Sequence, residues 1–262
     1  MNRKIWKALG IAVCMLALAA PRAMAETKVH VVTADTNFAE VVKTINATDV
    51  RDENVIELCA DITLTGNYTL KRNTTIKSEN GDCKISINGL NAGITVTGGT
   101  VLNLGANGYD KKLTIEGDTG IAFITVSGGA TAHMYENVTL QNRQQVDQAC
   151  VVLEENSVFN MHGGVIQNCK GKYGGVSLKN GSRFIMEGGT ISGCKGVWGG
   201  GLYAENSSTI EISGGTISGC TTSEAGMGGG LYAYKSTITI SRGTIENNKA
   251  TILDGKLPLL VD

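Results

Sequence analysis

Short apolar stretches recur along the chain at intervals of about 26 residues. Four of them align in one frame, with starts that lie 25, 26 and 28 residues apart: 159–169 (FNMHGGVIQNC), 184–194 (FIMEGGTISGC), 210–220 (IEISGGTISGC) and 238–248 (ITISRGTIENN). A repeat of this length is typical of solenoid proteins, in which each repeat stacks on the next.

Within each repeat the apolar positions alternate with polar ones. Phe184 and Met186 fall on one face of an extended segment and Ile185 on the other. The extended segments are three to five residues long and are separated by glycine pairs, and no repeat contains an amphipathic run of ten or more residues. The pattern therefore predicts short β-strands and excludes a helical repeat.

The same frame extends backwards through shorter apolar elements. Their first residues are spaced by 25 to 30 positions: Tyr68, Ile94, Ile124, Val151, Val176, Leu202 and Leu231. We predict an all-β fold, a right-handed parallel β-helix that forms a solenoid of about seven coils with 25–30 residues each. Inward ladders are expected to hold Phe159, Phe184, Ile210 and Ile238, and in a second row Ile166, Ile191, Ile217 and Ile245.

The start of the solenoid is predicted to carry a short capping helix over about 38–46. Asn37 is a suitable N-cap with Glu40 three residues later, and one face is apolar through Phe38, Val41, Val42 and Ile45. We assign 26–60 to this N-terminal cap and 61–262 to the β-helix. The last residues, ATILDGKLPLLVD, fit either one more partial strand or a longer array that has been cut off.

Residues 1–25 have the pattern of a signal peptide. Arg3, Lys4 and Lys7 precede an apolar run over 8–20, and small residues at Ala23 and Ala25 fit a cleavage site before Glu26. The chain is therefore expected to be exported, to the extracellular space, the cell surface or the periplasm. No transmembrane segment is expected in the mature chain.

Composition and charge exclude several classes of protein and of partner. The chain has 42% hydrophobic residues, which excludes a disordered protein, and its 35 glycines follow no collagen period. Loss of the signal peptide leaves 19 basic and 24 acidic residues, a net charge of −5. This balance argues against nucleic acid and anionic membranes as partners.

Six cysteines follow the signal peptide: Cys59, Cys83, Cys150, Cys169, Cys194 and Cys220. The last three occupy the same coil position, which Asn248 takes in the next coil. They fit a buried ladder of thiols or, alternatively, at least one disulfide. No metal site or cofactor is predicted, because CxxC and HxxxH spacings do not occur and His30, His133 and His162 are far apart in sequence.

One outward row is a candidate ligand-binding face. In the predicted register Thr69, Thr95, Thr125, Val152, Ser177, Tyr203 and Tyr232 stack on an outer surface, with Trp198 and Tyr234 nearby. Stacked exposed aromatic side chains can bind sugar rings through their faces. The alternative is that these residues only reflect the β-propensity of a flat sheet.

Two motifs carry a resemblance to known proteins. The units GGVI at 163–166 and GGTI at 188–191 and 214–217 resemble the GG-x-I repeat of the polymorphic outer-membrane protein family. The GGGLY stretches at 199–203 and 228–232 are similar to sequences in bacterial right-handed β-helix surface proteins. The resemblance implies an adhesin-like or structural module that is secreted or held at a cell surface, with host or environmental glycans or surface proteins as partners.

The other function to weigh is a carbohydrate-active enzyme of the pectin-lyase-like type, a polysaccharide lyase or hydrolase. Such enzymes need acids and bases that converge on one outer face. The carboxylates of the repeat region are scattered and resemble solvated surface charges: Glu154, Glu155, Glu187, Glu205, Glu211 and Glu224. No catalytic residue is therefore predicted.

Overall fold

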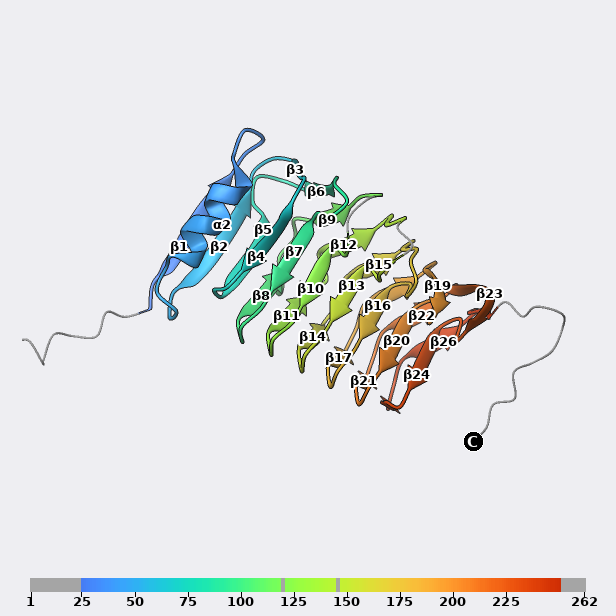
Figure 1. The fold of residues 1–262 in the computed structure, drawn as a ribbon. Helices are drawn as coiled ribbons and strands as arrows, with labels where there is room; N and C mark the ends of the chain where they lie inside the picture. Colours follow the sequence, from blue (N-terminus) through green and yellow to red (C-terminus); the bar gives the residue numbers. More distant parts are fainter. Residues whose placement is uncertain (1–24, 119–120, 145–146, 251–262) are drawn as a thin grey trace, which may run out of the picture.

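The computed structural model of the protein describes residues 25–250, apart from 119–120 and 145–146. Over these residues the chain forms a stack of coils (Figure 1). The coils contribute strands to three parallel sheets, here called A, B and C, and most coils pass through the sheets in that order. Neighbouring strands are parallel, so the fold is a parallel β-helix as predicted. Sheet C has the seven strands expected from the repeat, whereas sheets A and B have nine and eight, and the rod contains about eight coils.

The strands are short and of similar length in each sheet. Sheet A contains β1 (Thr27–Val32), β2 (Glu53–Leu58), β5 (Thr74–Ser78), β8 (Val101–Leu104), β11 (Thr131–Met134), β14 (Val158–Met161), β17 (Arg183–Met186), β21 (Thr209–Ile212) and β25 (Thr237–Ile240). Sheet B contains β3 (Ile62–Leu64), β6 (Cys83–Ile87), β9 (Leu113–Glu116), β12 (Val138–Gln141), β15 (Val165–Gln167), β18 (Thr190–Ser192), β22 (Thr216–Ser218) and β26 (Thr244–Glu246).

Sheet C and a small extra sheet complete the fold. Sheet C contains β4 (Asn67–Leu70), β7 (Gly93–Val96), β10 (Ile124–Val126), β13 (Val151–Leu153), β16 (Val176–Leu178), β20 (Leu202–Glu205) and β24 (Leu231–Tyr234). Sheet D pairs β19 (Lys195–Trp198) with β23 (Thr221–Met227) at the corner between sheets B and C. The repeat pattern did not predict sheet D, because its strands lack the apolar alternation of the other three sheets.

The inward ladders are confirmed. Phe159, Phe184, Ile210 and Ile238 are in register in sheet A, and Ile166, Ile191, Ile217 and Ile245 are in register in sheet B. All are fully buried except those of the last coil, where Ile238 is 38% and Ile245 is 40% exposed. Each ladder position is covered by its copies in the neighbouring coils, so only a terminal coil leaves its apolar side chains open to solvent.

A helix closes the N-terminal end. Helix α2 (Phe38–Asn46) has the predicted bounds, and Asn37 caps it by accepting a hydrogen bond from the amide of Ala39 at 3.1 Å. Phe38, Val42 and Ile45 are buried against the first coils, and the ring of Phe38 meets that of Tyr68 edge-on. The segment 26–60 thus contains α2 together with β1 and β2, which are the first two strands of sheet A.

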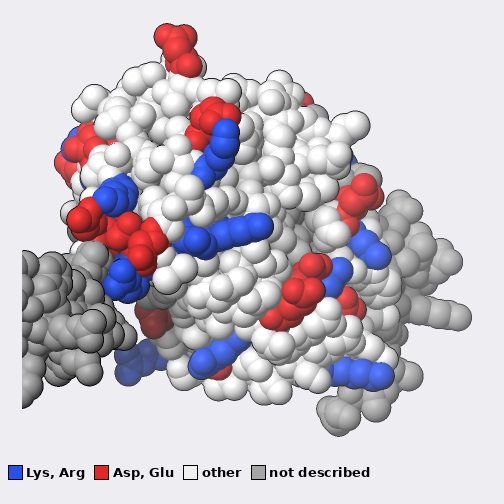
Figure 2. All heavy atoms as spheres, turned by 60° about the vertical axis from the view of Figure 1, so that its left-hand side comes forward, with Lys and Arg blue, Asp and Glu red and all other residues white. Residues whose placement is uncertain are grey.

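Two predictions lie outside the described residues. They are the signal peptide, of which only residue 25 is described, and the partial strand after Ala250. The described part of the chain contains no helix long and apolar enough to cross a bilayer. On the face drawn in Figure 2, basic and acidic side chains of the described residues lie side by side in small groups, separated by uncharged surface.

The thiol ladder is confirmed, and the six described cysteines are free thiols. Cys169, Cys194 and Cys220 are fully buried, each two residues beyond a strand of sheet B. Hydrogen bonds between neighbouring thiols raise the pKa of Cys194 and of Cys220, and burial raises the pKa of Cys169. Asn248 continues the row by accepting a hydrogen bond from the Cys220 amide at 2.9 Å.

This burial predicts that the cysteines react with a disulfide reagent at rates that follow their exposure. In the native chain from Glu26 onwards, Cys59 should react within minutes because it is partly exposed. Cys150, Cys169, Cys194 and Cys220 should react only when the chain unfolds, and mass spectrometry of the labelled peptides would identify each site. Rapid labelling of any of these four in the folded protein would contradict the ladder.

Candidate functional site

The predicted outward row of sheet C exists in the expected register. Thr69, Thr95, Thr125, Val152, Ser177, Tyr203 and Tyr232 are partners from one coil to the next. Small polar side chains occupy the row in the first coils and tyrosines in the last two. The row therefore becomes aromatic toward the C-terminal end of the rod.

A tyrosine outside the row covers its middle. The ring of Tyr173 stacks on that of Tyr203, with centroids 4.2 Å apart and planes at 26°. Val152, Ser177 and Tyr203 are consequently buried, although the sequence predicted an exposed row. The physical reason is that Tyr173 lies in the corner between β15 and β16, and strand alternation carries no information about where a corner segment folds.

The exposed part of this surface is formed by Trp198, Tyr232 and Tyr234. Tyr232 stacks on Tyr203 on one side, at 5.9 Å between centroids, and lies 5.9 Å from the Trp198 ring on another. Tyr234, two residues further along β24, is about half exposed. We call these three residues, together with the buried Tyr173 and Tyr203, the aromatic face. It contains all four residues that the sequence proposed for ligand binding.

Charged side chains border the aromatic face. The hydroxyl of Tyr203 donates a hydrogen bond of 2.7 Å to Glu205, whose carboxylate lies 3.9 Å from the ammonium of Lys179. The Lys179 nitrogen is also 4.9 Å from the centre of the Tyr173 ring, and that of Lys172 is 5.4 Å from it. Burial and the bond to Glu205 raise the pKa of Tyr203, so its phenol remains a donor at neutral pH.

Glycine fixes the path of the chain beside the aromatic face. Gly199 and Gly228 have φ of +63° and +70° and directly follow β19 and β23. A Cβ atom at either position would clash with the carbonyl oxygen of the leucine three residues later. These glycines are turn residues, and they bring Trp198 next to Tyr232.

The structure also pairs two histidines that the sequence placed far apart. His133 lies in β11 and His162 directly follows β14. His133 Nδ1 and His162 Nε2 are 2.9 Å apart, and His162 Nδ1 is 2.6 Å from a carboxylate oxygen of Glu187. Burial lowers the pKa of His133, and the neighbouring His162 lowers it further. Sequence reasoning missed the pair because the two residues do not occupy equivalent repeat positions: the register pairs His133 with Asn160. Among the described residues no three potential ligand side chains converge on a metal position.

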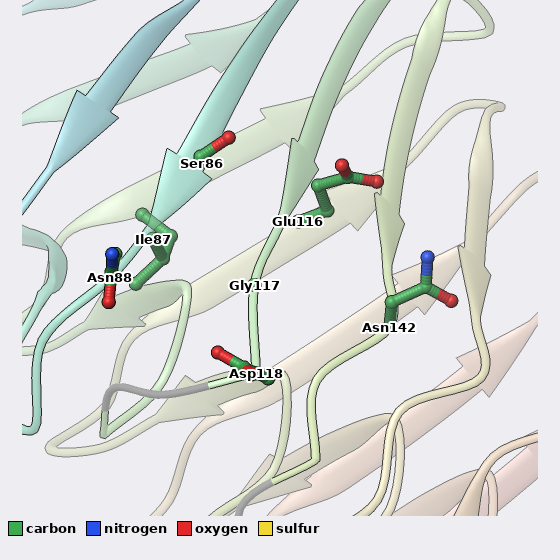
Figure 3. Close-up of a pocket in the computed structure, with 7 residues that line it drawn as sticks. All are labelled: Ser86, Ile87, Asn88, Glu116, Gly117, Asp118 and Asn142. Atoms are coloured by element: carbon green, nitrogen blue, oxygen red, sulfur yellow. The ribbon is translucent and has the colours of Figure 1, made fainter.

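A second surface that sequence reasoning missed is a hollow on the outer side of sheet B. It has a volume of about 430 Å³ and lies where β6, β9 and β12 end (Figure 3). Figure 3 shows Asp118 turned toward Ile87 and Asn88, with Glu116 and Asn142 on the other side. A neighbouring hollow of about 320 Å³ shares Glu116 and contains Lys84. Only the stacking of three coils brings these polar residues together.

Comparison with known proteins gives the family. Residues 119–255, just over half of the chain, match the family described as a right-handed beta helix region. This chain belongs to the right-handed β-helix family. Neither the curated proteins nor the solved structures gave a match. The matched part of this β-helix contains the whole aromatic face, and its parallel coils are therefore right-handed.

Two carboxylates on the outer surfaces of this β-helix are held by neighbouring side chains. Glu116 accepts a hydrogen bond of 2.8 Å from Gln141 and lies 3.2 Å from Lys84, and the bond from Gln141 contributes most to lowering its pKa. Glu211 binds Arg183 through both of its oxygens, at 2.6 Å each. Glu116 is thus an ionised acceptor at neutral pH, which suits hydrogen bonding to a ligand better than proton donation.

Proposed function

We propose that this protein is an exported, adhesin-like β-helix module that binds glycans through its aromatic face. The observation that carries the proposal is the position of Tyr232. Its ring is held between Tyr203 and Trp198 and remains partly exposed at the outer surface of sheet C. Such a ring offers a flat apolar surface whose orientation is fixed before a ligand arrives.

The surroundings of Tyr232 suit a sugar better than a purely apolar ligand. A sugar ring has an apolar face of C–H groups and an edge of hydroxyls. The aromatic rings match the face, while Glu205 can accept hydrogen bonds and Lys179 and Lys235 can donate them at the border. A few polar groups around an aromatic surface are a common composition for a small-molecule site.

The rest of the fold supports a binding role away from the cell interior. The predicted signal peptide directs the chain to export, and a stack of about eight coils forms a rigid rod ~35–40 Å long. The aromatic face lies in the coils opposite the α2 end (Figure 1). A module with this arrangement can present a binding surface at a distance from whatever holds its other end.

The proposal predicts the effect of one substitution. A glycan array probed with the chain from Glu26 onwards should give hits, and Tyr232→Ala should weaken binding to them about tenfold or more, ~1.4 kcal/mol. Tyr109→Ala is the matched control, because Tyr109 is also a partly exposed tyrosine but lies far away, between β8 and β9. Unchanged binding by Tyr232→Ala would overturn the proposal.

The same screen tests the enzyme alternative, which the hollow on sheet B favours. Glu116 and Asp118 both line this hollow. Every array hit should be incubated with the protein and followed for release of reducing or unsaturated sugar. Turnover that Glu116→Gln abolishes would make the protein a carbohydrate-active enzyme rather than a binding module.

A further inference from the structure

An unpaired hydroxyl lies beneath the aromatic face. Ser177 is in the outward row of sheet C between Val152 and Tyr203, yet its side chain has no exposed surface. Its hydroxyl oxygen has no hydrogen-bond partner. Most buried hydroxyls in folded proteins make a hydrogen bond, so a buried hydroxyl without one needs an explanation.

The side chain that covers Ser177 is Tyr173. Its ring stacks on Tyr203, the next residue of the row, and lies 4.9 Å from the ammonium of Lys179, two residues beyond Ser177 on the same side of the chain. These two contacts place the Tyr173 ring over the outer surface of β16. Tyr173 therefore occupies the position in which a ligand ring would stack on Tyr203 and reach the Ser177 hydroxyl.

The backbone that carries Tyr173 is firmly held. The carbonyl of Lys172 accepts hydrogen bonds from the amides of Val197 and Trp198, at 2.8 and 3.1 Å, and the carbonyl of Gly174 accepts one from Cys150 at 3.3 Å. A side chain at Gly174 would clash with the carbonyl of Gly200 in the next coil. With its backbone held, the buried Tyr173 ring can leave this position only by rotation about its Cα–Cβ bond.

We infer that Tyr173 closes a second sugar subsite, formed by Tyr203 and Ser177, which a glycan chain bound at Tyr232 opens by displacing the Tyr173 ring. This inference rests on the proposed function and extends it from one sugar ring to two. In the open state the incoming ring takes over the stacking on Tyr203, and one of its hydroxyls pairs with the Ser177 oxygen. Lys172 and Lys179 remain as donors beside it.

The inference predicts a dependence on ligand length. A disaccharide should bind at Tyr232 alone, whereas a hexasaccharide should reach both subsites and displace Tyr173. Tyr173→Ala should therefore bind the hexasaccharide about three- to tenfold more tightly than the wild type and the disaccharide equally well. Tyr173→Phe keeps the covering ring and is the control.

Ser177→Ala, which removes only an unpaired hydroxyl and should fold normally, should bind the hexasaccharide about threefold or more weakly.

The measurement is calorimetric titration with cellobiose and cellohexaose, with xylobiose and xylohexaose, and with a chondroitin disaccharide and hexasaccharide. Tryptophan fluorescence provides a second readout, because Trp198 is the one tryptophan after the predicted signal peptide. Binding at Tyr232 should change its emission in every folded variant.

The outcomes separate the two proposals. If the wild type binds these sugars but Ser177→Ala binds the hexasaccharide as the wild type does, Tyr173 is a structural cover and the subsite does not exist. The same holds if a folded Tyr173→Ala shows no gain for the hexasaccharide. If neither the wild type nor any variant binds any of the six sugars or any array glycan, the proposed function itself is wrong.

Discussion

Replacing Phe184 with alanine is expected to lower the free energy of unfolding by about 3–5 kcal/mol. Phe184 is fully buried in sheet A, and its ring stacks on that of Phe159 in the preceding coil, with centroids 5.9 Å apart. Its other ladder neighbour is Ile210. The truncation leaves a cavity lined by both coils, and a stack of regular coils has little freedom to close around it. Urea denaturation followed by circular dichroism would measure the loss.

Ile185 is the matched control for this experiment. It is the next residue of the same strand, points outward and is partly exposed. Ile185→Ala should cost less than about 1 kcal/mol. If both substitutions lowered the free energy of unfolding equally, the inward ladder would not be what holds the coils together.

Removal of the Arg143 side chain should have a similarly large effect, about 3–5 kcal/mol for Arg143→Ala. Arg143 is fully buried in the corner between sheets B and C. Its guanidinium donates hydrogen bonds to the carbonyls of Ile121, Gln148 and Lys170, at 2.7 Å for Gln148 and 3.1 Å for Lys170. These carbonyls belong to the corner segments of three successive coils. Alanine would leave them buried without this donor.

Arg183→Ala provides the comparison for Arg143. Arg183 also makes short bonds through two nitrogens, but to Glu211 on the exposed side of sheet A. Its loss should cost no more than about 1 kcal/mol, because solvent replaces a surface ion pair. Thermal melts of both variants would compare them directly. A smaller loss for Arg143→Ala than for Arg183→Ala would contradict the role given to Arg143 in joining the corners.

The sequence allowed much of this fold to be predicted because the solenoid repeats one local pattern. In a stack of coils, the residue that covers Phe184 occupies the same position one repeat away, so alignment of the repeats is also an alignment in space. This is why the ladders and the thiol row were correct. Helix α2 was predictable for a different reason, since its cap and its apolar face are encoded within ten residues.

The candidate site was only partly predictable. Its tyrosines Tyr203 and Tyr232 belong to the repeat and were found in the correct register. Tyr173 and Arg143 lie in corner segments that vary from coil to coil, and no periodic signal indicates that one covers Ser177 or that the other joins three coils. The pairing of His133 with His162 escaped notice because the two residues do not occupy equivalent repeat positions.

The in-register ladders also make each coil an interchangeable part. A coil inserted or deleted between β7 and β10, outside the aromatic face, would bring the same kinds of side chain into contact at both new boundaries, since Ile94 and Ile124 are partners there already. Unequal recombination between such repeats would lengthen or shorten the rod in steps of one strand spacing, about 4.8 Å. The helix-capped end would be unaffected. Descendants of one ancestral gene could therefore display the same aromatic face at different heights without redesigning the core.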